Sequence, residues 1–183
     1  MDDIKGSDQP VLNLELNNAE SYITDRDRIA VNVSPVDVAW HLDHLLKVII
    51  GIHLSLDKSE PAKFKYSWNF YRSLAFTLDR IPRGFAMSSK SVLPPDIIKT
   101  IDISAQLKHA RLVLQKFSEL DKNHFFDHFL LGLLDRDRAL KFVGIHTRHH
   151  LRIIRDIVKQ SKKDENSQET DKSTLTTNRD ALH

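Results

Sequence analysis

The stretch GIHTRHHLRII, residues 144–154, lies in the helical pattern on which the fold depends. Read as an α-helix, residues 139–157 place their apolar side chains on one stripe, with a gap that histidines fill. These apolar residues are Ala139, Phe142, Val143, Ile153, Ile154 and Ile157. At about 100° per residue, His146 and His150 fall inside the stripe, one turn apart. Two core-facing imidazoles need a polar partner, because an unpaired buried polar group costs about 1–3 kcal/mol. A metal ion is one such partner.

The rest of this helix is polar on the side away from the stripe. His149 sits near the boundary between the two faces. We expect the basic side chains to take the solvent face; they are Arg148, Arg152, Arg155 and Lys159.

The composition limits the classes of protein that the chain can belong to. With 183 residues it is long enough for one domain with a substantial core. It has no cysteine, so any transition metal must be held by histidine and carboxylate. The 27 basic and 25 acidic residues are mixed along the chain, which argues against a nucleic-acid partner. No apolar run reaches membrane-spanning length, and the acidic, polar first residues do not resemble a signal peptide. We therefore expect a cytoplasmic protein without a membrane partner.

Hydrophobic spacing predicts an all-α fold. The predicted helices cover about residues 10–24, 35–56, 64–79, 96–120 and 136–159, and Ser34 and Asp135 are the predicted N-caps of the second and the last. The fourth helix should turn inward Ile97, Ile101, Leu107, Leu114 and Phe117. Residues 81–95 read as an ordered connection, and residues 124–132 as a short aromatic link.

The composition changes at about Gln160. From there the chain is rich in Ser, Thr, Asp, Glu, Lys and Asn, and it cannot bury enough surface to offset its chain entropy. We therefore expect a helical domain over residues 1–159 and a disordered polar tail over residues 160–183.

A third histidine is placed to join the pair on the last helix. His44 lies on the second helix, which is apolar over most of its circumference, so its ring should face the bundle core. Three protein ligands with an open position for water are typical of a catalytic metal site. Imidazole does not select sharply among metals, so zinc, nickel, iron and manganese all stay open.

Other residues compete for these roles. His41 and His149 each lie three positions from a chosen ligand. The two histidines of a His-x-x-x-His pair are often simply exposed to solvent, or are buried with ordinary hydrogen-bond partners. Asp43, Asp127 and Asp156 are candidates to orient a ligand imidazole, although most such acids are solvated. The remaining histidines read as ordinary polar residues: His53, His109, His124 and His183.

Several segments together resemble a known family. They are residues 40–49 (WHLDHLLKVI), 81–84 (IPRG) with 90–92 (KSV), 128–132 (HFLLG) and 145–154 (IHTRHHLRII). In order and spacing they are similar to the DinB/YfiT-like superfamily, and more narrowly to its branch of uncharacterised bacterial proteins, over about residues 10–158. The resemblance implies an up-down-down-up four-helix bundle, with an extra short helix here. It also implies a three-histidine metal site on His44, His146 and His150, the same residues that the burial argument selects.

The chain departs from the family pattern near the expected mouth of the site. The family link reads His-Pro-Tyr-Phe-Gly, whereas residues 128–132 read His-Phe-Leu-Leu-Gly. The loop FAMSS, residues 85–89, has less Lys, Ala and Pro than is usual. These differences bear on the substrate and not on the ligands.

Two functions follow as hypotheses. The first is a metal-dependent hydrolase or thiol-dependent transferase acting on an unidentified small molecule, with His128 or His41 as a proton carrier near the open position. The second is a non-enzymatic helical module in which the histidines hold a structural ion or hydrogen-bond one another. Nucleic-acid or stress-partner binding is a weaker third option. A homodimer, frequent in the superfamily, is compatible with the composition.

Overall fold

The chain is mostly helical, as predicted, with a small sheet that the sequence patterns did not indicate. The computed structural model describes residues 8–82 and 92–180, with side chains for residues 11–82 and 92–167. The α-helices in this part are α1 Asp8–Ser21, α2 Val38–Asp57, α3 Phe70–Leu78, α4 Thr100–Lys116 and α5 Arg136–Asp180. Short 3-10 helices cover Tyr22–Asp25, Pro61–Lys63 and Phe117–Glu119, and the strands are β1 Phe125–His128 and β2 Gly132–Asp135.

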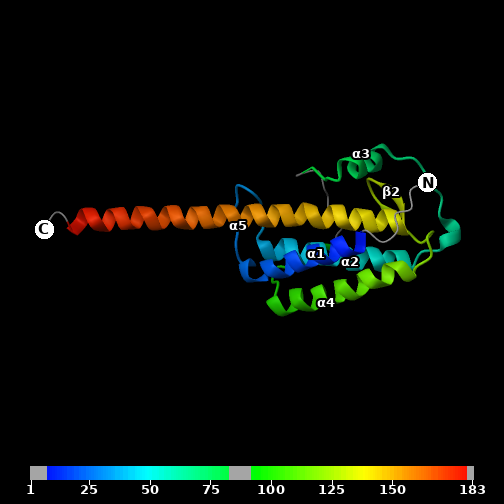
Figure 1. The fold of residues 1–183 in the computed structure, drawn as a ribbon, viewed down its shortest axis with the longest axis horizontal. Helices are drawn as coiled ribbons and strands as arrows, with labels where there is room; N and C mark the ends of the chain where they lie inside the picture. The colour runs from blue at the N-terminus through cyan, green and yellow to red at the C-terminus, as the bar shows by residue number, and fades with distance from the viewer. Residues whose placement is uncertain (1–7, 83–91, 181–183) are drawn as a thin grey trace.

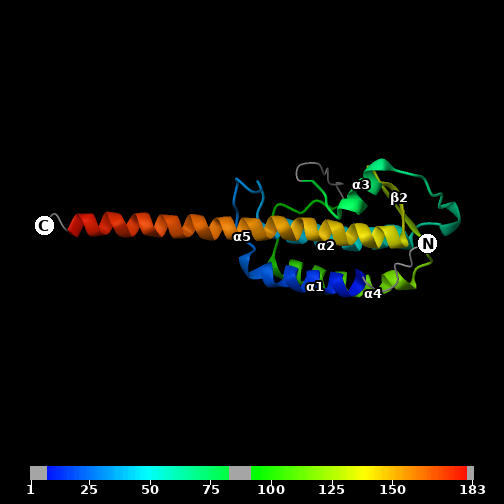
Figure 2. The ribbon, with the colours of Figure 1, turned by 45° about the horizontal axis from the view of Figure 1, so that its top comes forward.

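Four of the helices pack along one another. α2 contacts both α4 and α5, and α1 also contacts both. Figures 1 and 2 show that α1 and α5 run in one direction and that α2 and α4 run in the opposite direction. The shared core between them contains fully buried side chains from every one of these helices, among them Leu12, Leu16, Leu42, Leu45, Ile103 and Ile154.

The start of α2 differs from the prediction. Its N-cap is Asp37, whose carboxylate accepts a hydrogen bond of 2.8 Å from the Trp40 amide, so the prediction of Ser34 is wrong. Ser34 is instead buried in the preceding loop, where its hydroxyl contacts His41. The Asp135 prediction is confirmed, because its carboxylate accepts from the Arg138 amide at 2.9 Å in the first turn of α5.

α3 and α4 are shorter than predicted. Asn69 caps α3 by accepting a 2.9 Å hydrogen bond from the Arg72 amide, which sets the helix start at Phe70. The inward face of α4 carries Ile103, Leu107, Ala110 and Leu114 at helical spacing, and Phe117 of the following 3-10 helix is also buried. Ile97 and Ile101, predicted to face inward, are 77% and 74% exposed. Ile97 precedes α4, and Ile101 lies about 200° around the helix from Ile103.

The predicted aromatic link is a β-hairpin. β1 and β2 pair antiparallel, with Phe125 opposite Asp135 and His128 opposite Gly132. Gly132 has φ 69°, a left-handed conformation that glycine adopts without strain. Arg72 of α3 is buried and donates to the carbonyls of Leu131 and Leu133, at 3.2 and 3.1 Å, which ties α3 to this hairpin.

α5 continues as a helix through residues 160–180, where we expected disorder (Figure 1). This segment lacks an apolar stripe and is rich in Ser, Thr, Asp and Asn, but it contains neither proline nor glycine, the two residues that disfavour a helix most. Contacts with the rest of the chain extend past the predicted boundary at residue 159, since Ser161 is buried and Glu165 bonds Arg28. In the described residues, no helix combines the length and apolarity that a bilayer crossing requires.

Candidate metal centre

Three buried histidines from two helices converge in the core between α2 and α5. His44, His146 and His150 each offer a nitrogen, and these nitrogens all lie within 4.8 Å of one another. The ring centroids are 5.2 Å apart for His44 and His146, 4.8 Å for His44 and His150, and 4.5 Å for His146 and His150. Ligand nitrogens on a tetrahedral zinc are about 3.4 Å apart, so small side-chain rotations would close the cluster around an ion.

The helices place these rings through their packing. Phe142, Val143, Ile153 and Ile154 are buried, which confirms the predicted stripe of α5 and turns His146 and His150 toward α2. On the other helix, Trp40 stacks on His44, with ring centroids 5.0 Å apart and an interplanar angle of 23°. Phe142 packs against His146 at 5.7 Å. The cluster therefore has aromatic walls and little water contact.

His44 is held in one tautomer. Its Nδ1 lies 2.9 Å from the backbone oxygen of Val92, and because a carbonyl can only accept, Nδ1 carries the proton. The lone pair is then on Nε2. A metal-ligating histidine commonly donates its other ring N–H to such an acceptor, which orients the ring. Backbone acceptors of this kind have no signature in a sequence.

His146 and His150 differ in their partners. Nδ1 of His150 lies 2.9 Å from Nδ1 of His41. Nδ1 of His146 is buried with no hydrogen-bond partner among the described residues. An ion bound to this ring would supply a partner for one of its nitrogens, so the donor set fits a divalent metal.

Burial keeps all three imidazoles neutral. It lowers the pKa of His44 below the ordinary 6.5, and it lowers the pKa values of His146 and His150 much further, with the neighbouring imidazoles adding to the effect. At neutral pH each ring therefore offers a lone pair instead of a positive charge, which is the form that binds metals.

The two histidines predicted as proton carriers occupy different settings. His41 is 4% exposed and lies behind His150, with Nε2 at 3.0 Å from Ser34 Oγ. His128, at the end of β1, accepts 3.2 Å hydrogen bonds at Nδ1 from the amides of Leu130 and Leu131. Burial lowers its pKa to about 4.

The remaining candidates have other partners. His149 donates from Nδ1 to the carbonyl of Ile81 at 3.0 Å, which connects α5 to the segment after α3. The Asp43 carboxylate contacts Lys47 Nζ at 2.7 Å and Gln106 Nε2 at 2.6 Å. His53, expected to be an ordinary polar residue, is buried against Phe117.

The other polar residues for which the sequence made predictions differ in burial. His124 bonds the Leu56 carbonyl, His109 is exposed, and the side chain of Asp127 is exposed. Arg148, expected on the solvent face, is half-buried and pairs with Glu15 and Asp79. His183 and the segment 83–91 lie outside the described residues.

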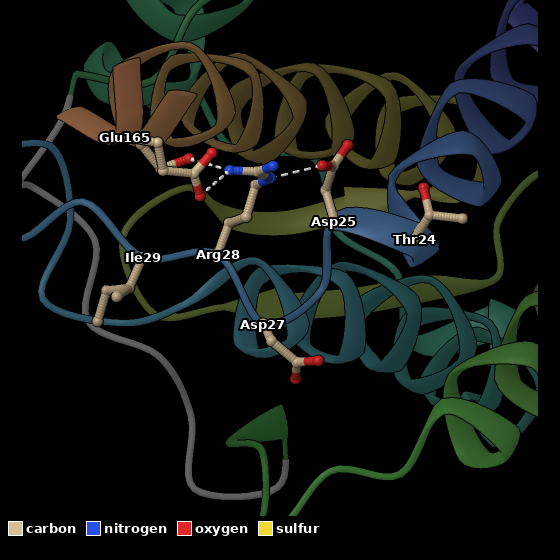
Figure 3. A pocket seen from close by; sticks show the side chains of 7 residues that line it. Thr24, Asp25, Asp27, Arg28, Ile29 and Glu165 are labelled. Atoms are coloured by element: carbon tan, nitrogen blue, oxygen red, sulfur yellow. Dashed lines mark hydrogen bonds and ion pairs between the residues drawn. The ribbon is translucent and has the colours of Figure 1, made fainter. Parts of the chain in front are cut away.

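A surface hollow near the start of the α5 extension is separate from this cluster (Figure 3). Arg28 crosses it and pairs with Asp25 at 2.7 Å and Glu165 at 2.8 Å. Ser161 on its wall is eleven residues beyond His150, about 16 Å along the helix. Its central charges are paired with one another, so we assign it no ligand.

Comparisons of the chain with protein-family models, with curated proteins and with solved structures find no match. The site itself is therefore the basis for any function.

Proposed function

We propose that this protein binds one divalent metal ion through His44, His146 and His150. The observation that carries the proposal is the convergence of three buried imidazoles from α2 and α5, with their donor nitrogens within 4.8 Å. Nothing in the sequence spacing requires rings so far apart in the chain to meet. A purely apolar core would place leucines there, since neutral imidazoles without partners are costly to bury.

We further propose that the chain is a DinB/YfiT-like bundle. The motif order of the sequence supports this class, and so do the directions of α1, α2, α4 and α5. Three protein ligands leave a coordination position for water or a small thiol, and a divalent metal acidifies the water that it binds. This donor set favours a metal-dependent hydrolase or a thiol-dependent transferase acting on a small molecule.

The residues of this chain would supply the rest of the site. Trp40 and Phe142 exclude bulk water from the cluster, and the carbonyl of Val92 orients His44. Burial lowers the pKa of His128 to about 4, so this ring is neutral near pH 7. Its Nδ1 accepts the two backbone amides, so its proton is on Nε2, which would donate a hydrogen bond to a substrate.

The first experiment is elemental analysis of protein purified without a metal-affinity tag. We expect one ion per chain in the wild type, one in the control His109→Ala, which replaces an exposed histidine, and none in His146→Ala. A wild type without metal after incubation with zinc, nickel, iron and manganese would refute the proposal.

Catalysis needs a second measurement. The loaded protein should turn over a member of an ester, amide or low-molecular-weight thiol panel, and His146→Ala should not. A loaded protein that is inert on all three panels, and whose metal loss melts the fold, would instead be the structural-metal module.

A further inference from the structure

A second layer of hydrogen bonds lies behind the histidine cluster. His41 is one turn before His44 on α2, and its Nδ1 lies 2.9 Å from Nδ1 of His150. On its far side, His41 Nε2 lies 3.0 Å from Ser34 Oγ. Both His41 and Ser34 are buried, at 4% and 6% exposure. The row Ser34–His41–His150 therefore runs from the loop before α2 into the cluster.

When both imidazoles are neutral, the hydrogen bonds of this row allow only two arrangements of the protons. The two Nδ1 atoms share one proton, because two N–H groups would repel and two lone pairs would make no bond. In the first arrangement, His150 Nδ1–H donates to His41, and His41 Nε2–H donates to Ser34 Oγ. In the second, His41 Nδ1–H donates to His150, and the Ser34 hydroxyl donates to His41 Nε2.

Only the first arrangement is compatible with a metal ligand at Nε2 of His150. In the second, Nε2 of His150 carries the proton and has no lone pair for an ion. The choice therefore depends on His41 acting as an acceptor at Nδ1. Ser34 Oγ can receive the His41 proton, and it also accepts the Val36 amide at 3.3 Å, which anchors the hydroxyl at the end of the row.

We propose that His41 is a positioning residue that, with Ser34 behind it, holds His150 in the tautomer whose Nε2 faces the metal. The proposal rests on the proposed metal function. It assigns His41 a different role from the sequence-based one, namely orientation of a ligand in place of proton transfer at the open position. An acceptor on the outer nitrogen raises the basicity of a ligand imidazole and fixes its rotation, so its loss weakens metal binding about 10–100-fold.

The test compares substitutions that keep or remove the acceptor. Asparagine places a carbonyl oxygen near the position of Nδ1, so His41→Asn should retain zinc affinity close to that of the wild type. His41→Leu keeps the volume but not the acceptor, and it should bind zinc about 10–100-fold more weakly. His53→Leu is the matched control, because it replaces another buried histidine of α2 that is not a member of the row. Zinc affinity is measured by competition with a chromophoric chelator at constant pH, and the melting temperature of each metal-free variant is recorded beside it.

If His41 only stabilised the fold, its variants would have lower melting temperatures, but His41→Asn and His41→Leu would bind zinc with the same affinity. Equal affinities for the wild type and His41→Leu, or equal losses in His41→Asn and His41→Leu, would overturn the positioning role. A wild type that binds none of zinc, nickel, iron and manganese would refute the metal function itself.

A measurement on the wild type makes the test independent of variant folding. Long-range ¹H–¹⁵N spectra of the zinc-loaded protein should show His150 protonated at Nδ1 and His41 protonated at Nε2. A His41 ring protonated at Nδ1 would overturn the proposal.

Discussion

The imidazoles of His44 and His150 lie with their ring centroids 4.8 Å apart, although one residue belongs to the first half of the chain and the other to the last helix. Each of these rings has its outer nitrogen engaged, His44 by the Val92 carbonyl and His150 by His41. The inner nitrogens are therefore the ones available to a shared ion. An ion held by both rings would therefore link α2 to α5 in the core.

Metal should stabilise the fold. Zinc at one hundred times its dissociation constant should raise the free energy of unfolding by about 2.7 kcal/mol, because it binds the native state alone. Urea unfolding with and without zinc measures the difference, which should vanish in His150→Ala and persist in His109→Ala. An equal zinc effect in His150→Ala would place the ion elsewhere.

Removing Arg148 alone should destabilise the protein more than replacing Arg148 and Glu15 together with neutral residues. Arg148 Nη1 lies 2.9 Å from Glu15 Oε1, Glu15 is 6% exposed, and burial raises the pKa of its carboxyl group. Arg148→Met leaves that carboxyl without its cation and should cost toward the lower end of about 3–5 kcal/mol, because the arginine is partly solvated. The double variant with Glu15→Gln should regain part of this loss in urea titrations. Arg155→Met, at an exposed arginine of α5, should have little effect, and additive losses in the double variant would contradict the coupling.

Stability of the metal-free protein should fall as the solution is acidified from pH 6.5 toward pH 4. An unfolded histidine takes up a proton near pH 6.5, whereas burial lowers the pKa of native His128 to about 4. Between these values the unfolded state binds more protons, so the free energy of unfolding rises with pH and levels off above 6.5.

His128→Asn isolates this contribution, because its carbonyl oxygen can still accept the amides of Leu130 and Leu131. The slope of unfolding free energy against pH should decrease by at most about 1.4 kcal/mol per pH unit. The measurement is urea unfolding in chelator at several pH values. The same slope in wild type and variant would show that His128 titrates normally.

Arg72 should hold the hairpin to α3. Its buried guanidinium donates to the carbonyls of Leu131 and Leu133, and such charged hydrogen bonds are worth about 1.5–3 kcal/mol each. Arg72→Ala should lower the free energy of unfolding and speed hydrogen exchange of the β1 and β2 amides. Thr77→Ala, at an exposed position of α3, serves as the control. Unchanged exchange in Arg72→Ala would exclude this anchoring role.

Truncation should locate the end of the stabilising part of α5. A chain that ends at Ser167 retains the contacts of Arg28 with Ser161 and Glu165, at 3.2 and 2.8 Å. It should therefore have the same melting temperature as the full-length protein. A chain that ends at Gln160 loses both and should melt at a lower temperature. Circular dichroism melts of the three chains make the comparison, and equal melting of the shortest chain would show that these contacts contribute no stability.

Helical periodicity alone was enough to place the stripe of α5 and to select His44, His146 and His150 as core-facing residues. This succeeded because a regular helix converts sequence spacing directly into direction. The same reasoning misplaced Ile101 on α4 and Arg148 on α5. An isoleucine is buried only where a neighbouring helix covers it. An arginine can be partly buried when it pairs with a buried carboxylate on another helix, as Arg148 does with Glu15.

Other features depended on contacts between distant segments. The Val92 carbonyl behind His44 and the Ser34–His41 row behind His150 join residues that no local pattern links. The hairpin of β1 and β2 depends in the same way on Arg72, which reaches it from α3. Spacing along one helix determines the direction in which a side chain points. The packing of the helices determines which groups it contacts there, so hydrogen-bond partners depend on the tertiary structure.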